Sequence, residues 1–199
     1  MKLPHIDPIL PKAGRIAFDG PDWIFDLKYD GFRAVLYLED GRCKFRSKRG
    51  KLLSFSMLER SLTERIRAKN AILDGEICSL APGGWPDFRA LMRREGEIAY
   101  IAFDLLWLDG KDLRDTPLSQ RKKALERFRE KRAAGVIRTA FFTSGSGVGL
   151  FELARTYDLE GMVAKRTTDL YWPGVRWYKI KNPDYSQNIG RYKYFRRSS

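Results

Sequence analysis

The nine residues FDLKYDGFR, from Phe25 to Arg33, join an apolar strand pattern to a lysine, an Asp-Gly turn and an arginine. A lysine amine is a nucleophile only when it is unprotonated, and the ordinary pKa of a lysine is about 10.4. Burial and nearby cations favour the neutral amine. We therefore predict Lys28 as a nucleophile, with a solvated hairpin end as the alternative. Gly31 would allow a tight turn and a close approach of the backbone to a ligand, and Arg33 would hold a ribose hydroxyl or a phosphate.

Charged side chains recur in other apolar stretches. LDGE at 73–76 places two carboxylates in an apolar strand, where each must be paired, hydrogen-bonded or bound to a metal. An aromatic, Phe103, precedes a carboxylate in another such strand, and Glu160 opens a third. Side chains alternate along a strand, so Lys179 and Lys181 share one face of the last one. Two cations there would bind phosphates and favour a neutral amine nearby; a solvated face is the alternative.

The pattern along the rest of the chain mixes strands and helices without a strict βαβ alternation. Predicted strands cover 23–29, 33–47 as a hairpin turning at Asp40-Gly41, 71–80, 98–108, 136–143, 161–167 and 176–181. Predicted helices cover 55–69 with Ser54 or Ser56 as the cap, 86–94 with Pro86 in the first turn, Thr116-Pro117 to Arg132, and 148–158. Together these elements predict an α+β fold of mostly antiparallel sheets flanked by helices.

Composition predicts a folded protein with a polyanionic partner. The 199 residues include 38 Lys and Arg against 25 Asp and Glu, a net charge of +13, and nucleic acid is the first candidate for such a surface. The alternative is a merely basic protein. Cys43 and Cys78 are expected to be free, buried thiols. The sequence has neither a signal peptide nor an apolar run of membrane-spanning length, so a cytoplasmic protein without a membrane partner is expected.

In order and spacing, six segments resemble the nucleotidyltransferase motifs of ATP-dependent DNA ligases. They are KYDGFR (28–33), SKRG (47–50), LDGE (73–76), YIAFDLLWLDG (100–110), EGMVAK (160–165) and WYKIK (177–181). The set is far more specific than a single motif match. The resemblance implies the fold shared with mRNA capping enzymes, an ATP-grasp-like architecture. It also implies ATP as the AMP donor, Mg²⁺ or Mn²⁺ as the metal, and nicked double-stranded DNA as the partner.

The resemblance also implies a role for each matching residue. Lys28 would attack the α-phosphate of ATP and become a lysyl-AMP. Arg33 would contact the ribose, Glu76 the ribose or the metal, and Phe103 would stack on adenine. Glu160 would help to place the metal. Lys179 and Lys181 would bind the α-phosphate, and we expect these two to be catalytic together with Lys28.

Two positions depart from the motifs. Asp26 lies where the family usually has a glutamate that reads the adenine amino group, so its side chain is shorter. Lys48 lies where the family has an arginine. A lysine keeps the positive charge but cannot make the two parallel hydrogen bonds of a guanidinium group. Both residues are still expected to bind the nucleotide.

Pro4, Pro8, Pro11 and Pro21 predict an extended arm over residues 1–21. The resemblance implies an adenylation domain (22–183), which leaves a basic aromatic tail (184–199) in which Arg191 and Tyr192 begin the basic and aromatic interleaving. Residues 182–199 are too few for a five-stranded OB-fold domain, so we expect none. A separate OB-fold or DNA-end-binding protein would then act in trans on a monomer. Two alternatives stay open: a non-catalytic nucleic-acid-binding module with the same fold, and an RNA ligase or GTP-dependent capping-type enzyme.

Overall fold

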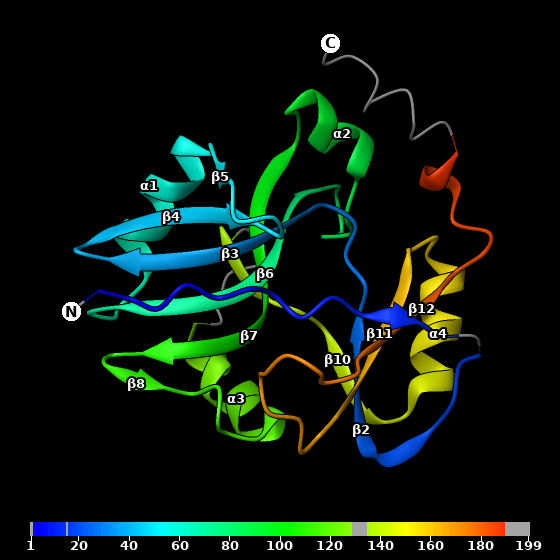
Figure 1. Cartoon of the computed structure of the whole chain (residues 1–199). Coiled ribbons are helices and arrows are strands. Elements are labelled where there is room, and N and C mark those ends of the chain that lie inside the picture. The colour runs from blue at the N-terminus through cyan, green and yellow to red at the C-terminus, as the bar shows by residue number, and fades with distance from the viewer. Residues whose placement is uncertain (1, 15, 129–134, 190–199) are drawn as a thin grey trace.

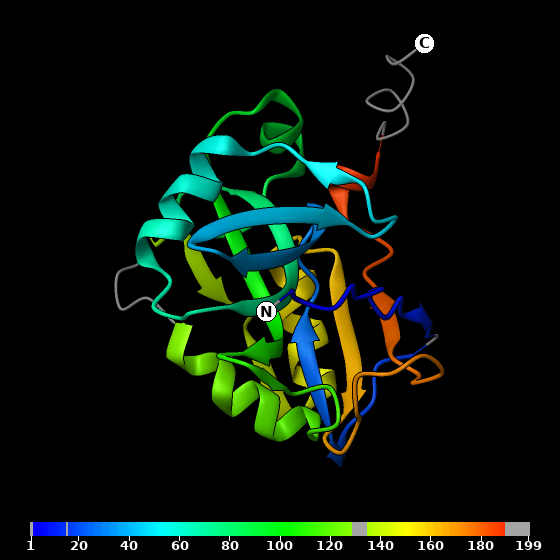
Figure 2. The same cartoon turned by 60° about the vertical axis from the view of Figure 1, so that its left-hand side comes forward.

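The computed structural model describes residues 2–14, 16–128 and 135–189. Two sheets face each other across the middle of the molecule, and helices cover their outer faces (Figures 1 and 2). Nearly every strand pairing is antiparallel, the two exceptions being the short pairings of β1 with β12 and of β9 with β7. The predicted α+β class is confirmed. In the part of the chain that the structure describes, no helix is long and apolar enough to cross a membrane.

The larger sheet has seven strands in the order β5-β4-β3-β6-β7-β8, with β9 also paired to β7. Their bounds are β3 Phe32–Glu39, β4 Arg42–Ser47, β5 Leu52–Leu53, β6 Ala71–Leu80, β7 Glu97–Leu108, β8 Lys111–Asp112 and β9 Ile137–Thr139. The predicted hairpin is confirmed: Glu39 pairs with Arg42, and Asp40 and Gly41 both have positive φ, as a type I′ turn requires.

The smaller sheet has five strands in the order β1-β12-β11-β2-β10. Their bounds are β1 Lys12–Ala13, β2 Gly20–Leu27, β10 Phe142–Gly145, β11 Gly161–Arg166 and β12 Tyr178–Lys181. The arm before β2 starts beside β3 of the larger sheet and runs to β12 of the smaller one (Figure 1). Leu3, Ile6 and Ile9 of this arm are buried against a cluster that includes Trp107 and Trp177.

Helices pack on both sheets. Their bounds are α1 Ser56–Arg65, α2 Phe88–Arg93, α3 Leu118–Leu125 with a 3₁₀ turn at Glu126–Phe128, α4 Gly147–Thr156, and a second 3₁₀ turn at Ser186–Asn188. The main core lies between the larger sheet and α1 to α3, and a separate apolar cluster lies under α4 on the smaller sheet. Cys43 and Cys78 are buried and free, as predicted.

Four details differ from the expected elements. Residues 136–143 form two strands in different sheets, because the chain crosses from one sheet to the other at Ala140 and Phe141, whose backbone groups bond to Ala102 and Leu27 respectively. Helix α1 ends at Arg65 and has no side-chain cap, so neither predicted serine caps it.

The two other differences concern helix ends. Pro86 lies before α2 and bridges to Leu80, while Asp87 is the cap that accepts from the amide of Ala90. Helix α3 ends at Leu125, and the last predicted residues of that helix, 129–132, lie outside the described residues.

Candidate active site

A cavity of about 470 Å³ lies between the two sheets, with walls from both. Eight of the nine predicted site residues line it: Asp26, Lys28, Arg33, Lys48, Glu76, Phe103, Glu160 and Lys179. The ninth, Lys181, does not line the cavity, although its amine lies 3.2 Å from the Glu160 carboxylate. The fold thus brings together residues that are up to 153 positions apart in the sequence (Asp26 to Lys179).

Lys28 follows the last residue of β2 and reaches into the cavity from the smaller sheet. Its Nζ donates to Glu160 Oε2 at 2.5 Å, and the same carboxylate binds Lys181 through Oε1. Burial alone would raise the pKa of Glu160, but the charges of Lys28 and Lys181 outweigh it and lower that pKa. The sequence predicted an amine among cations, whereas the structure gives it a carboxylate as its immediate partner.

Two glycines make this arrangement possible. A Cβ at Gly31 would lie 2.1 Å from the Ile77 carbonyl oxygen. The sequence predicted that Gly31 would let the backbone approach a ligand, whereas in the structure it lets the backbone approach β6. Gly161, next to Glu160, has φ of 128°, and a Cβ there would lie 2.1 Å from the Ile180 carbonyl oxygen. A side chain at either position would push apart the strands that carry the site.

Glu76 lies on β6, opposite Arg33 of β3, and its carboxylate is half-buried in the cavity wall. Burial raises the pKa of Glu76 to about 7, and the negative charges of Glu160 and Asp30 add to this, while Lys28 and Arg33 act in the opposite direction. Among the described residues, no group of three or more His, Cys, Asp or Glu side chains gathers as a metal site. Glu76 and Glu160 both line the cavity, and carboxylate oxygens are the donors that a hard cation prefers.

Phe103 projects into the cavity from a β-bulge. In the pairing of β6 with β7, Asp74 lies opposite Asp104 and Gly75 opposite Ala102, so Phe103 is the extra residue. Bulges often re-aim a side chain beside a functional site. The Arg33 guanidinium lies 4.5 Å from the centre of the Phe103 ring, and the Lys165 amine lies 4.8 Å from it.

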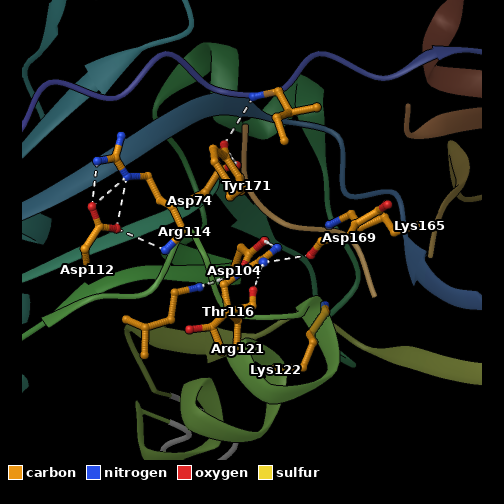
Figure 3. A network of polar contacts seen from close by, with 12 residues as sticks. Asp74, Asp104, Asp112, Arg114, Thr116, Arg121, Lys122, Lys165, Asp169 and Tyr171 are labelled. Atoms are coloured by element: carbon orange, nitrogen blue, oxygen red, sulfur yellow. Dashed lines mark hydrogen bonds and ion pairs between the residues drawn. The ribbon is translucent and has the colours of Figure 1, made fainter. Parts of the chain in front are cut away.

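Arg33 is held by a carboxylate of the protein itself. Its Nε and Nη2 donate to the two oxygens of Asp74 at 2.7 and 2.6 Å, and Nη2 also donates to the Ile9 carbonyl. The Tyr171 hydroxyl donates to the same carboxylate at 2.6 Å (Figure 3). A ribose contact by Arg33 would therefore come from a guanidinium that Asp74 has already oriented.

Asp26 lies at the buried end of the cavity, on β2, and is 2% exposed. Lys122 of α3 donates to its Oδ1, and the amine of Lys165 of β11 lies 2.6 Å from its Oδ2. Burial alone would raise the pKa of Asp26, but the charges of these two lysines outweigh it and lower that pKa. Lys48, in contrast, is exposed in the turn after β4, at the rim of the cavity.

Sequence reasoning missed four residues around the site, three of them buried and one, Val163, partly buried. Val163 and Trp177 line the cavity, and the alternation along β11 puts Val163 on the same side as Lys165. Lys122 lies behind Asp26, and Arg121 donates to both oxygens of the fully buried Asp104 at 2.8 and 2.9 Å (Figure 3). On a charged helix, nothing local to the sequence distinguishes these two cations from the exposed Lys123.

Comparison with known proteins assigns the chain to a family. The family model described as ATP dependent DNA ligase domain matches residues 11–181. The chain belongs to this family. Its sequence is 31% identical over 185 residues to the "Multifunctional non-homologous end joining DNA repair protein LigD" of Mycobacterium tuberculosis, a match that covers 89% of this chain and 24% of that protein. The chain thus spans about a quarter of the length of this ligase-domain relative.

Two solved structures share the fold of this ligase-domain chain. The ligase domain of M. tuberculosis LigD has a TM-score of 0.75 and 31% identity, over 87% of this chain and 58% of that one. A mycobacterial DNA ligase D complexed with ATP and MES has a TM-score of 0.73 and 30% identity, over 88% of this chain and 60% of that one. Both matches fit the expected nucleotidyltransferase fold.

Proposed function

We propose that this chain is the adenylating core of an ATP-dependent DNA ligase, and that Lys28 takes AMP from ATP. One observation carries the proposal: an amine at the wall of a cavity between two sheets contacts a carboxylate that also holds a second lysine. Membership of the ligase-domain family and the likeness to a ligase complexed with ATP support it. The chain spans only part of its relatives, so nick sealing belongs to the proposal as well.

The first step is a nucleotidyl transfer. The Lys28 nitrogen attacks the α-phosphorus of ATP, a P–N bond forms, and the bond from that phosphorus to the bridging oxygen breaks. The Lys28 ammonium gives one proton to solvent before the attack, pyrophosphate leaves with the electron pair of the broken bond, and the nitrogen of the new P–N bond gives a second proton to solvent. Lys28 must leave Glu160 to react, and an incoming triphosphate would favour this because it competes for the two lysines that Glu160 holds.

The remaining residues would position the nucleotide in the cavity. Phe103 would stack on the base, and Asp26 would accept a hydrogen bond from the adenine amino group. Arg33 would contact the ribose. The three lysines near the mouth, Lys48, Lys179 and Lys181, would neutralise phosphate oxygens, which is the main contribution that a protein makes to this chemistry.

Glu76 and Glu160 would hold Mg²⁺ or Mn²⁺ in this scheme. The fit rests on their all-oxygen donor set and on Glu76, whose raised pKa marks a buried carboxylate that gains from a nearby cation. The bound ion would supply positive charge to the phosphates. Because Glu160 contacts Lys28, Glu76 and Glu160 would hold that charge close to the nucleophile.

In the second and third steps, the AMP would pass to the 5′-phosphate of nicked double-stranded DNA, and the 3′-hydroxyl would displace it to seal the strand. The proposed units are the arm (1–21), the adenylation domain (22–183) and the tail (184–199). Most of the tail, residues 190–199, lies outside the described residues. A separate OB-fold or end-binding protein acting in trans on a monomer stays part of the proposal.

The proposal is tested by incubating the chain with ATP labelled at the α-phosphate and Mg²⁺, and then adding nicked DNA. We expect label on the denatured protein, followed by its transfer to DNA. Lys28→Arg should abolish the label, while Lys44→Arg, an exposed lysine on β4, should keep it. DNA binding without any label would favour the non-catalytic module, and label from GTP but not ATP would favour a capping-type enzyme.

A further inference from the structure

Asp26 is the carboxylate at the buried end of the cavity, and its two oxygens differ. Oδ1 accepts from Lys122. Oδ2 is buried and, among the described residues, accepts no hydrogen bond of proper geometry, although the Lys165 amine lies 2.6 Å away as an ion pair. The ammonium of Lys165 is thus a second cation on this carboxylate. Asp26 lines the cavity, so a ligand bound there meets a carboxylate that two lysines hold.

Lys122 is distinct from the residues that would contact the nucleotide. It lies on α3, which packs against β7 of the larger sheet, and its side chain reaches across to β2 of the smaller sheet. It is only 4% exposed, does not line the cavity, and its amine lies 4.8 Å from the centre of the Phe142 ring. Burying an ammonium is costly unless it is paired, so its position indicates a specific task.

That task follows from the chemistry of the two purines. An ionised carboxylate only accepts hydrogen bonds, so it suits the amino group of adenine and repels the carbonyl oxygen that guanine carries at the same place. A protonated carboxyl group also donates, and would accept either purine. Burial favours the protonated form, and Lys122 and Lys165 oppose it. Lys165 also contacts the rings of Phe103 and Trp177, whereas Lys122 contacts one ring and donates a hydrogen bond to Asp26.

We propose that Lys122 is a positioning residue that sets the choice of adenine over guanine by holding Asp26 as a fixed, ionised acceptor. This inference rests on the proposed use of a purine nucleotide by this cavity. Lys122 does not line the cavity, so base specificity would depend on a residue that does not touch the nucleotide. It also accounts for the shorter acid at position 26: Lys122 and Lys165 fix the side chain from two sides.

The test measures equilibrium binding of ATP and of GTP by calorimetry in EDTA, where no transfer to Lys28 occurs. The variants are Lys122→Met, Lys122→Arg and, as the matched control, Lys123→Met, which alters the next and exposed lysine of α3. Lys122→Met should lower the preference for ATP over GTP about tenfold, the size of a hydrogen bond to a charged group. Lys122→Arg should restore most of the preference, and Lys123→Met should leave it unchanged.

The role of Lys122 and the proposed function are tested by different results. An unchanged preference in folded Lys122→Met, or an equal loss in Lys123→Met, would overturn the role of Lys122 even if Lys28 is adenylated normally. If Lys122→Met does not fold, Asp26→Asn decides: it should show the same tenfold loss, and a wild-type preference would overturn the inference. Failure of adenylation in the wild type would instead count against the proposed function, since binding is measured without it.

Discussion

Glu160 binds two lysines at once, the proposed nucleophile Lys28 and its neighbour Lys181. This sharing gives the carboxylate, which is only 6% exposed, two cationic partners, one of them the half-exposed Lys181. A triphosphate would offer both lysines new acceptors, and the metal ion proposed at Glu160 would then supply the positive charge that this buried carboxylate needs. The site is thereby organised before the nucleotide arrives, which is what positioning by a rigid scaffold requires.

Glu76 provides a pH test of the unliganded site. Its pKa of about 7 in the folded chain lies above the ordinary 4.5, so its contribution to stability is complete below pH 4.5 and is lost as the pH rises through 7. Glu76→Gln has no titratable group at this position, so the variant does not lose this part of its stability as the pH rises. The variant should gain unfolding free energy over the wild type on going from pH 5 to pH 8, by on the order of 1–3 kcal/mol, since one unit of pKa corresponds to about 1.4 kcal/mol.

Urea unfolding at both pH values, without divalent ions or nucleotide, measures this gain. Glu64→Gln, on the exposed face of α1, is the matched control and should show no such pH-dependent gain. Equal differences between Glu76→Gln and wild type at pH 5 and pH 8 would contradict the assignment of Glu76 as a buried carboxylate that gains a proton on folding.

At the residue scale, the sequence predicted those site residues whose side chains are unusual for their own segment. Lys28 beside an Asp-Gly turn and Glu76 within an apolar strand are unusual in their own segments, so both stood out. The partners of these residues were not predictable in the same way. The bond from Lys28 to Glu160 joins positions 132 residues apart, and Lys122 reaches Asp26 over 96 residues. These long-range contacts depend on how the two sheets pack against each other, which the pattern of the sequence does not show.

At the scale of elements, long apolar strands and the Asp-Gly hairpin were predictable, because burial and turn chemistry act locally. The break within 136–143 was not, because both halves have strand-like sequences and only the sheet-to-sheet crossing separates them. The packing of the arm was also not predictable from the sequence. Its prolines predict an extended segment, but only the structure shows that it bridges both sheets and ends in β1 beside β12.

The arm should contribute to stability through its buried side chains. Ile6 is 5% exposed in the cluster with Trp107, and its amide donates to the Tyr37 hydroxyl at 2.9 Å. Ile6→Ala should lower the unfolding free energy by about 2 kcal/mol or more, the cost of removing a buried aliphatic side chain. Ile16→Ala, in which the isoleucine is 79% exposed, is the control and should cost little. Equal effects in urea unfolding would show that the arm is not docked.

At the scale of the whole molecule, two sheets form a cavity at their junction, and the chain as a whole carries a net charge of +13. The charge was evident from composition and predicted a polyanionic partner, but composition does not say where the partner lies. In the proposed reaction the 5′-phosphate of DNA must reach the AMP. DNA would therefore lie over the mouth of the cavity, near Lys48 and the turn that follows it.

This placement predicts a strong salt dependence of binding to nicked duplex DNA. If six or more phosphates are contacted, affinity should fall about 10³-fold between 50 and 200 mM salt. Lys51→Gln, three residues after Lys48 and directly before β5, should reduce the slope of log affinity against log salt by about one, while Lys111→Gln, an exposed lysine on β8, should not. Fluorescence anisotropy measures both slopes. A flat salt dependence, or equal changes in the two variants, would place DNA elsewhere.

The most direct measurement is the position of the AMP on the chain. After incubation with ATP and Mg²⁺, the protein is digested and its peptides are sequenced by mass spectrometry to locate the added nucleotide. The account predicts AMP on the side chain of Lys28 and on no other lysine, and its disappearance in Lys28→Arg. AMP on Lys179, Lys181 or another residue, or an adduct that survives in Lys28→Arg, would contradict it.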